Sequence, residues 1–210
     1  MNIMKWWIKF MYPLVESIRI ENGIVLNLNY HQDRLKRTFL HVYGEPAPFK
    51  LDELIKFPKD LSADKIKLRF LYNKTSFRYE TEKYKPKSIK TLQIVKDNTI
   101  NYSCKKTNRR SIDRLMTSKG ECDDILIVKN EYITDTSSAN IVFFDGKEWL
   151  TPDTPLLLGT CRARLINTGK IREIPIRLEQ IPTFQSFCLI NAMVEGLGSP
   201  LPIANIKDLG

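Results

Sequence analysis

The chain has 210 residues, of which 42% are hydrophobic and 27% are charged, and its formal net charge is +9. This balance excludes disorder as the dominant state and fits one large domain or two small ones. Four cysteines without a CxxC pair, and only two histidines, argue against a metal site or a disulfide framework and favour the reducing cytoplasm.

The amino-terminal run MNIMKWWIKF is basic and aromatic. It is too short to span a bilayer, and no small-residue cleavage site follows it. We interpret residues 1–12 as a disordered extension or a mis-assigned start, with Met11 as an equally good initiator. Contact of Trp6 and Trp7 with a membrane surface is a minor alternative.

An amino-terminal α+β lobe is predicted over residues 13–85. LVESIRI alternates apolar and polar residues, Asn22-Gly23 is a typical two-residue hairpin turn, and IVLNL continues as the return strand. Residues 30–43 have the apolar spacing of a helix. KIKLRFLY and SFRYETEKY predict two further strands, and the segment around Pro86 predicts a linker.

The second lobe is predicted over residues 86–210, with strands at TLQIV, DDILIVK, ANIVFFD and EWLT. Turns are expected at Lys129-Asn130 and Asp145-Gly146. Residues 108–118 predict one helix. A second helix is expected to begin at Gly159 or Thr160 and to end at Gly169, a typical carboxyl-terminal glycine. The pattern indicates an α+β protein in two unequal lobes.

One dense basic run contains Lys105, Lys106, Arg109, Arg110 and Arg114. It fits either a basic helix on a nucleic-acid backbone or a site for one small phosphorylated ligand, and charge alone does not decide. For an aldehyde ligand, Lys105 is the candidate amine, because nearby positive charges depress a lysine pKa and favour the neutral nucleophile. Taken alone, a surface lysine is the plainer interpretation.

Three other segments would suit the same ligand. Asp135 ends a predicted strand, where its carboxylate suits a pyridinium nitrogen, although an ordinary turn aspartate is the plainer interpretation of this residue alone. Gly159-Thr160 opens a helix whose dipole favours a phosphate, although Thr160 would also serve as an N-cap. Arg34 in HQDRL suits the same phosphate, although an arginine on a helix is usually solvated.

Together these segments resemble the class IV aminotransferase and aminodeoxychorismate lyase family, over about residues 13–196. VESIRIENGIVLNLNYHQDRL is similar to the family's strand, turn and His-x-x-Arg helix, whose arginine, here Arg34, binds the cofactor phosphate. KKTNR resembles the setting of the cofactor lysine and favours Lys105 over Lys106. The remaining family positions match Asp135 and Asn140 in ITDTSSANIVFFDG, Gly159, Thr160 and Cys161 in LLLGTCR, and Asn191 in LINAM.

The resemblance implies a two-lobed fold-type IV enzyme, similar to D-amino acid aminotransferase, with a small amino-terminal α/β sandwich lobe and a carboxyl-terminal lobe like an open β-barrel. It implies pyridoxal 5′-phosphate held by Lys105 as a Schiff base. It also implies a homodimer that acts on a small carboxylate substrate, with neither nucleic acid nor membrane as a partner.

Two departures bear on the reaction. The family usually has glutamate where this chain has Asp135, and Arg110 replaces a tyrosine of branched-chain aminotransferases. We favour a 4-amino-4-deoxychorismate lyase, which forms 4-aminobenzoate, a folate precursor, and pyruvate. Arg78 is a candidate contact for a substrate carboxylate, although a strand-edge arginine is the plainer interpretation. The alternatives are an aminotransferase for branched-chain or D-amino acids, an inactive homologue, and a nucleic-acid-binding module.

Overall fold

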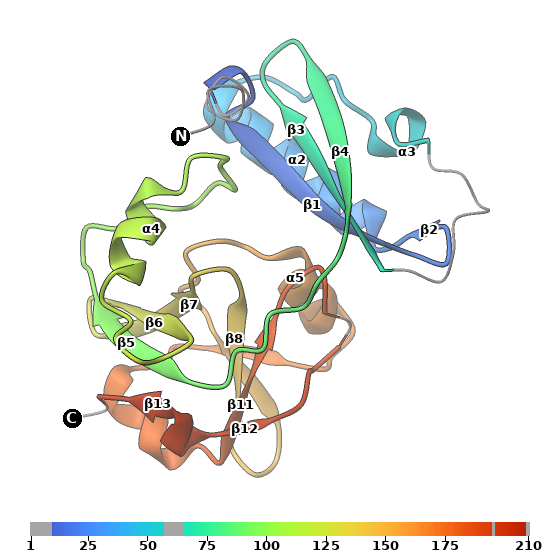
Figure 1. The fold of residues 1–210 in the computed structure, drawn as a ribbon. Coiled ribbons are helices and arrows are strands. Elements are labelled where there is room, and N and C mark those ends of the chain that lie inside the picture. Colours follow the sequence, from blue (N-terminus) through green and yellow to red (C-terminus); the bar gives the residue numbers. More distant parts are fainter. Residues whose placement is uncertain (1–9, 57–64, 195, 209–210) are drawn as a thin grey trace. The chain divides into compact units, whose positions relative to one another are not determined.

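A computed structural model describes residues 10–56, 65–194 and 196–208. The chain divides into two compact units (Figure 1). The first comprises Met1–Lys85 with Cys104–Asn108, and the second comprises Pro86–Ser103 with Arg109–Gly210. Of the predicted extension 1–12, residues 1–9 lie outside the described residues. The carbonyl of Met11 accepts a hydrogen bond from Asn73 Nδ2 at 2.9 Å, so this residue is bonded to the first unit.

An antiparallel sheet with the strand order β2-β1-β3-β4 forms the first unit. Its strands are β1 (Leu14–Glu21), β2 (Ile24–Val25), β3 (Ile66–Tyr72) and β4 (Phe77–Lys83). The predicted hairpin turn is confirmed, with positive φ at Asn22 and Gly23. The return strand is shorter than predicted, because Asn27 adopts a left-handed conformation and the helix begins at the next residue.

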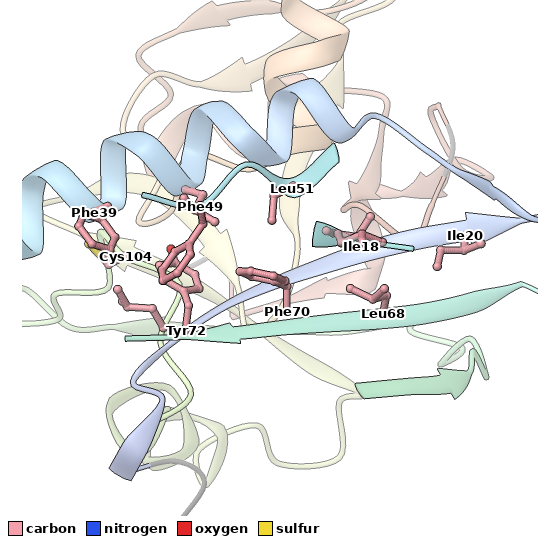
Figure 2. Packing of buried hydrophobic residues seen from close by; sticks show 12 residues of the cluster. Ile18, Ile20, Phe39, Phe49, Leu51, Leu68, Phe70, Tyr72 and Cys104 are labelled. Carbon is pink, nitrogen blue, oxygen red and sulfur yellow. The ribbon is translucent and has the colours of Figure 1, made fainter. Parts of the chain in front are cut away.

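Helix α2 (Leu28–Tyr43) packs on one face of this sheet and ends at Gly44, where φ is 73°. Alternate residues of β1, among them Ile18 and Ile20, point toward the helix and pack with Phe39, Phe70 and other buried side chains (Figure 2). The short helix α3 (Leu51–Leu54) contributes Leu51 to the same core.

Residues 104–108 belong to the first unit, whereas we predicted them in the carboxyl-terminal lobe. Cys104 is buried in the first core (Figure 2). The following residues run antiparallel to the start of β1, where Val15 N donates to the Lys105 carbonyl at 3.0 Å and Thr107 N donates to the Pro13 carbonyl at 2.9 Å. This long-range pairing carries the candidate lysine into the unit that contains Arg34.

The second unit is built on a larger mixed sheet, in which β8 pairs with β7, β9 and β11. Its described strands are β5 (Leu92–Lys96), β6 (Asp124–Lys129), β7 (Tyr132–Thr136), β8 (Asn140–Phe144), β9 (Trp149–Pro152), β10 (Arg172–Ile174), β11 (Ser186–Ile190), β12 (Leu201–Pro202) and β13 (Ile206–Lys207). The two sheets with their helices confirm the α+β class.

Two α-helices and two 3-10 helices lie among the described residues of this unit. They are α4 (Arg110–Met116), α5 (Thr160–Asn167), η1 (Leu178–Thr183) and η2 (Ile203–Asn205). Helix α4 is shorter than the predicted 108–118. The turn after β6 lies at Asn130-Glu131, one residue later than predicted, because these two residues have positive φ. In the part of the chain that is described, no helix is long and apolar enough to cross a membrane.

Candidate active site

A buried carboxylate in the first unit holds two side chains of α2. Glu16 stands on the inward face of β1, and Arg34 Nε donates to its two carboxylate oxygens at 2.9 and 3.2 Å. Arg34 Nη2 and His31 Nδ1 both contact Glu16 Oε2, at 2.5 and 2.7 Å. His31 and Arg34 are three positions apart on the helix, so both side chains reach the same carboxylate.

The charges in this cluster decide the protonation of its members. Burial by itself would raise the pKa of Glu16, but Arg34 and His31 outweigh it and lower the pKa to about 2. Burial lowers the pKa of His31, Glu16 opposes that effect, and the charges of Arg34 and Lys105 add to it. Glu16 is therefore ionised and His31 neutral at pH 7, with the imidazole proton on Nδ1, where it is donated to Glu16.

Lys105 is half-buried, whereas Lys106 is exposed. The charge of Lys105 acts on His31, which places this lysine beside the cluster of Glu16, His31 and Arg34. The first unit thus brings together two of the predicted site residues, Lys105 and Arg34, although they are far apart in the sequence.

A second buried carboxylate, Asp135, lies in β7 of the second unit. Its Oδ1 accepts a hydrogen bond from Asn140 Nδ2 at 2.7 Å, and its Oδ2 accepts one from Leu157 N at 2.9 Å. Burial raises the pKa of Asp135 to about 6, against the lowering effect of these hydrogen bonds and of the charge on Arg162. Among the described residues, Asp135 forms no ion pair, so its negative charge is incompletely compensated.

Asn140 connects Asp135 to the start of α5. Its Nδ2 also donates to the Leu157 carbonyl at 2.9 Å. Its Oδ1 lies so close to Gly159 that a Cβ at this glycine would be 1.9 Å away. The amide of Asn140 therefore touches both the carboxylate and the residue that precedes the helix.

Gly159 is the N-cap of α5, and a glycine has no side chain to form a cap hydrogen bond. The alternative in which Thr160 is the N-cap is therefore wrong. Thr160 and Cys161 are both buried in the first turn. The first turn of α5 holds no acidic residue, so the positive end of the helix dipole suits an anionic group.

Asn191 follows β11 and shapes the neighbouring loop. Its Oδ1 accepts a hydrogen bond from Met193 N at 2.9 Å, and its carbonyl accepts one from Val194 N at 3.1 Å. Cys161 Sγ lies 3.6 Å from the Val194 carbonyl. The loop after β11 therefore packs against the first turn of α5.

Gly159→Ala is expected to lower the free energy of unfolding by about 1–3 kcal/mol and to weaken the Asn140–Asp135 hydrogen bond, because the new methyl group must displace the amide. Gly198→Ala is a matched control, since its Cβ would lie 3.9 Å from the nearest side chain. Urea unfolding of both variants measures the difference. Equal stability of the two variants would contradict the close packing at Gly159.

The family model of class IV amino-transferases matches residues 13–198 of this chain. The chain belongs to this family. An uncharacterized protein of Haemophilus influenzae is 43% identical over 185 residues, which are 87% of this chain and 98% of that protein.

Two solved structures are similar to this chain and support its fold-type IV architecture. One is a candidate 4-amino-4-deoxychorismate lyase of Haemophilus somnus, with 33% identity and a TM-score of 0.82, covering 88% of this chain and 98% of that one. The other is a hypothetical aminotransferase of Mycobacterium tuberculosis in its PLP-bound form, with 14% identity and a TM-score of 0.74, covering 93% and 81%. The second likeness concerns the fold alone.

Family membership implies use of pyridoxal 5′-phosphate, and the residues of this class IV protein fit that cofactor. The buried carboxylate of Asp135, whose negative charge is incompletely compensated, would suit a pyridinium N–H, and the start of α5 would suit a phosphate. Lys105, which is half-buried, would offer an amine to the aldehyde. When bound, this cofactor acts as an electron sink for negative charge on the carbon next to the substrate nitrogen.

Arg78 and two arginines of the basic run contact neighbouring groups of the protein. Arg78 lies in β4, and its charge is paired with Glu80 at 3.3 Å. Lys105 and Lys106 precede α4 and lie in the other unit, so the basic residues do not form one helix from 105 to 114. Arg109 Nη2 donates to the Ser137 carbonyl at 2.7 Å, and Arg114 pairs with Asp97 at 2.5 Å, which leaves these charges engaged within the second unit.

Sequence reasoning assigned no role to Glu16, His31 or Arg162. Glu16 could have been noticed as a charged residue at an inward position of an alternating strand, on the same face as Ile18. His31 was visible only as part of the His-x-x-Arg pattern. Arg162 is buried after the Gly-Thr pair, where it donates to the Pro152 carbonyl and pairs with Glu173.

Proposed function

We propose that this protein is a PLP-dependent 4-amino-4-deoxychorismate lyase, which converts its substrate to 4-aminobenzoate and pyruvate. The observation that carries the proposal is the similarity to the Haemophilus somnus protein of that name, which extends over nearly the whole of both chains at 33% identity. The compact chain lacks the tyrosine that the resemblance implied for branched-chain enzymes, and Arg110 stands there instead.

In this proposal, each candidate residue has a role toward the cofactor. Arg34 and the start of α5, formed by Gly159, Thr160 and Cys161, bind the phosphate, with Asn191 supporting the latter. Asp135 keeps the pyridine nitrogen protonated, and Asn140 orients Asp135. Lys105 would hold the cofactor through its aldehyde and would move protons at the reacting carbon of the substrate.

The substrate is a small dicarboxylate in this proposal, and Arg78 stays a weak candidate for one of its carboxylates. A homodimer, with neither nucleic acid nor membrane as a partner, stays a prediction from the resemblance, and the cytoplasm stays a prediction from the cysteines. The runner-up within the family is an aminotransferase for branched-chain or D-amino acids.

Product analysis separates these activities. The PLP-loaded protein is incubated with 4-amino-4-deoxychorismate, and 4-aminobenzoate is measured by fluorescence while pyruvate is measured by coupled reduction. We expect equimolar products from the lyase. Parallel incubations supply amino acids with a 2-oxo acid. Amino transfer in that panel without 4-aminobenzoate formation would establish the aminotransferase instead, and activity in neither incubation would indicate an inactive homologue.

A further inference from the structure

We propose that Glu16 is a positioning residue, whose one carboxylate aims the guanidinium of Arg34 at the cofactor phosphate and fixes His31 as the Nδ1–H tautomer. This inference rests on the proposed function, in which Arg34 binds the phosphate. It assigns a role to a buried charge that the chemistry at Lys105 and Asp135 does not use.

The contacts on Arg34 determine which edge of its guanidinium is occupied. Glu16 takes the edge formed by Nε and Nη2, with distances of 2.9 and 2.5 Å. All hydrogen bonds of Arg34 within the described part of the chain go to this carboxylate. A guanidinium is planar, so two contacts along one edge fix its plane and direct the Nη1–Nη2 edge away from Glu16. That remaining edge matches two oxygens of a phosphate.

The same carboxylate acts on His31. Glu16 Oε2 lies 2.7 Å from His31 Nδ1, and a carboxylate only accepts hydrogen bonds, so Nδ1 carries the proton. The tautomer leaves Nε2 as an acceptor rather than a donor. Because His31 and Arg34 share one acceptor, a change at Glu16 is expected to affect both side chains together.

Three elements contribute titratable groups to the cluster of Glu16, His31 and Arg34. Arg34 and His31 come from α2, Lys105 from the segment 104–108, and Tyr72 from β3. Burial and then the charge of Glu16 raise the pKa of Tyr72, which stays a neutral phenol. Glu16 is thus the anion that pairs with the cation of Arg34, and its removal is expected to alter the local field as well as the geometry.

Glu16→Gln keeps the size of the side chain but replaces one acceptor oxygen by a donor. Binding of PLP is compared with binding of pyridoxal, which lacks only the phosphate, in the wild-type protein and in Glu16→Gln, Glu16→Asp and Arg34→Gln. We expect Arg34→Gln to lower the preference for PLP by about 10–100-fold. Glu16→Gln should lower it by about 10-fold, with pyridoxal affinity nearly unchanged, and Glu16→Asp should lie between Glu16→Gln and the wild type.

Glu21→Gln is the matched control. Glu21 is another glutamate of β1, and it pairs with Arg19 rather than with His31 or Arg34. It should leave the preference for PLP unchanged. In the Arg34→Gln background, Glu16→Gln should have no further effect on this preference. Equal losses of PLP and pyridoxal affinity in Glu16→Gln, or an unchanged preference for PLP, would overturn the proposal.

Nitrogen NMR of the cofactor-free protein provides an independent measurement. His31 and the exposed His41 are the only two histidines, so His41 serves as an internal reference. His31 should show the Nδ1–H tautomer in the wild type and in Glu16→Asp and lose it in Glu16→Gln. If the wild type bound neither PLP nor pyridoxal, the proposed function would fail, and an unchanged His31 spectrum in a folded Glu16→Gln would separately sink the role of Glu16.

Discussion

Replacing Lys105 with alanine is expected to abolish covalent attachment of pyridoxal phosphate and to lower the rate of the reaction by about 10²–10⁴-fold or more. Lys105 is half-buried beside the buried cluster of Glu16, His31 and Arg34. Its backbone carbonyl, not its side chain, pairs with Val15. Alanine therefore removes the amine while the strand pairing that places residue 105 is retained.

Lys106→Ala is the control, because this neighbouring lysine has the same charge and is exposed. Absorbance measures the bound cofactor, and borohydride reduction followed by peptide mass spectrometry locates a pyridoxyl group. We expect the label on Lys105 in the wild type and in Lys106→Ala. Labelling of Lys106, or covalent binding that survives Lys105→Ala, would show that the register of the KKTNR match is wrong.

Asp135→Asn is expected to lower the rate by about 10²–10³-fold and at the same time to change how stability depends on pH. The rate falls because the neutral amide no longer holds a proton on the pyridine nitrogen. Asp135→Glu, which restores the usual family residue, is the companion variant. Its extra methylene must fit a fully buried site, which costs about 1–3 kcal/mol of stability while the charge is kept.

The stability effect follows from the raised pKa of Asp135. The folded protein holds this proton up to about pH 6, whereas the unfolded chain releases it near pH 3.8. Between these values the folded state binds more protons, so the contribution of Asp135 to stability is present at low pH and falls as pH rises through 6. The total loss is about 3 kcal/mol, from about two pKa units at 1.36 kcal/mol each.

Urea unfolding of the cofactor-free protein at several pH values from about 4 to about 7 tests this loss. As pH rises, the unfolding free energy of the wild type should fall relative to that of Asp135→Asn. Any constant penalty from the mismatched hydrogen bonds to Asn140 and Leu157 cancels in this comparison. Parallel pH profiles of the two proteins would contradict a raised pKa at Asp135.

Local patterns predicted most elements of the fold. The alternation in LVESIRI, the Asn22-Gly23 turn and the helical spacing of residues 30–43 each depend on neighbouring residues. Short elements such as β10 escaped prediction, because three largely polar residues become a strand only by pairing with β9. Periodicity describes how a segment buries one face, but not which partner covers it.

The order of short motifs also determined, by itself, the family and the candidate residues Arg34, Lys105 and Asp135. Those motifs record residue types at fixed spacing, and the cofactor chemistry depends on residue types. They carried no information on the partners of each side chain. Arg34, for which a solvated side chain was the plainer alternative, is buried against Glu16, and Gly159 rather than the alternative Thr160 is the N-cap.

Only the tertiary structure decided the contacts between distant segments. It paired residue 105 with residue 15 and so moved the candidate lysine into the first unit, and it set Asn140 between Asp135 and Gly159. Such contacts depend on how elements pack, and the free energy of burying a charge depends on the partners that packing supplies. The sequence determined which chemical groups are available, and packing determined which of them are held together and in which protonation state.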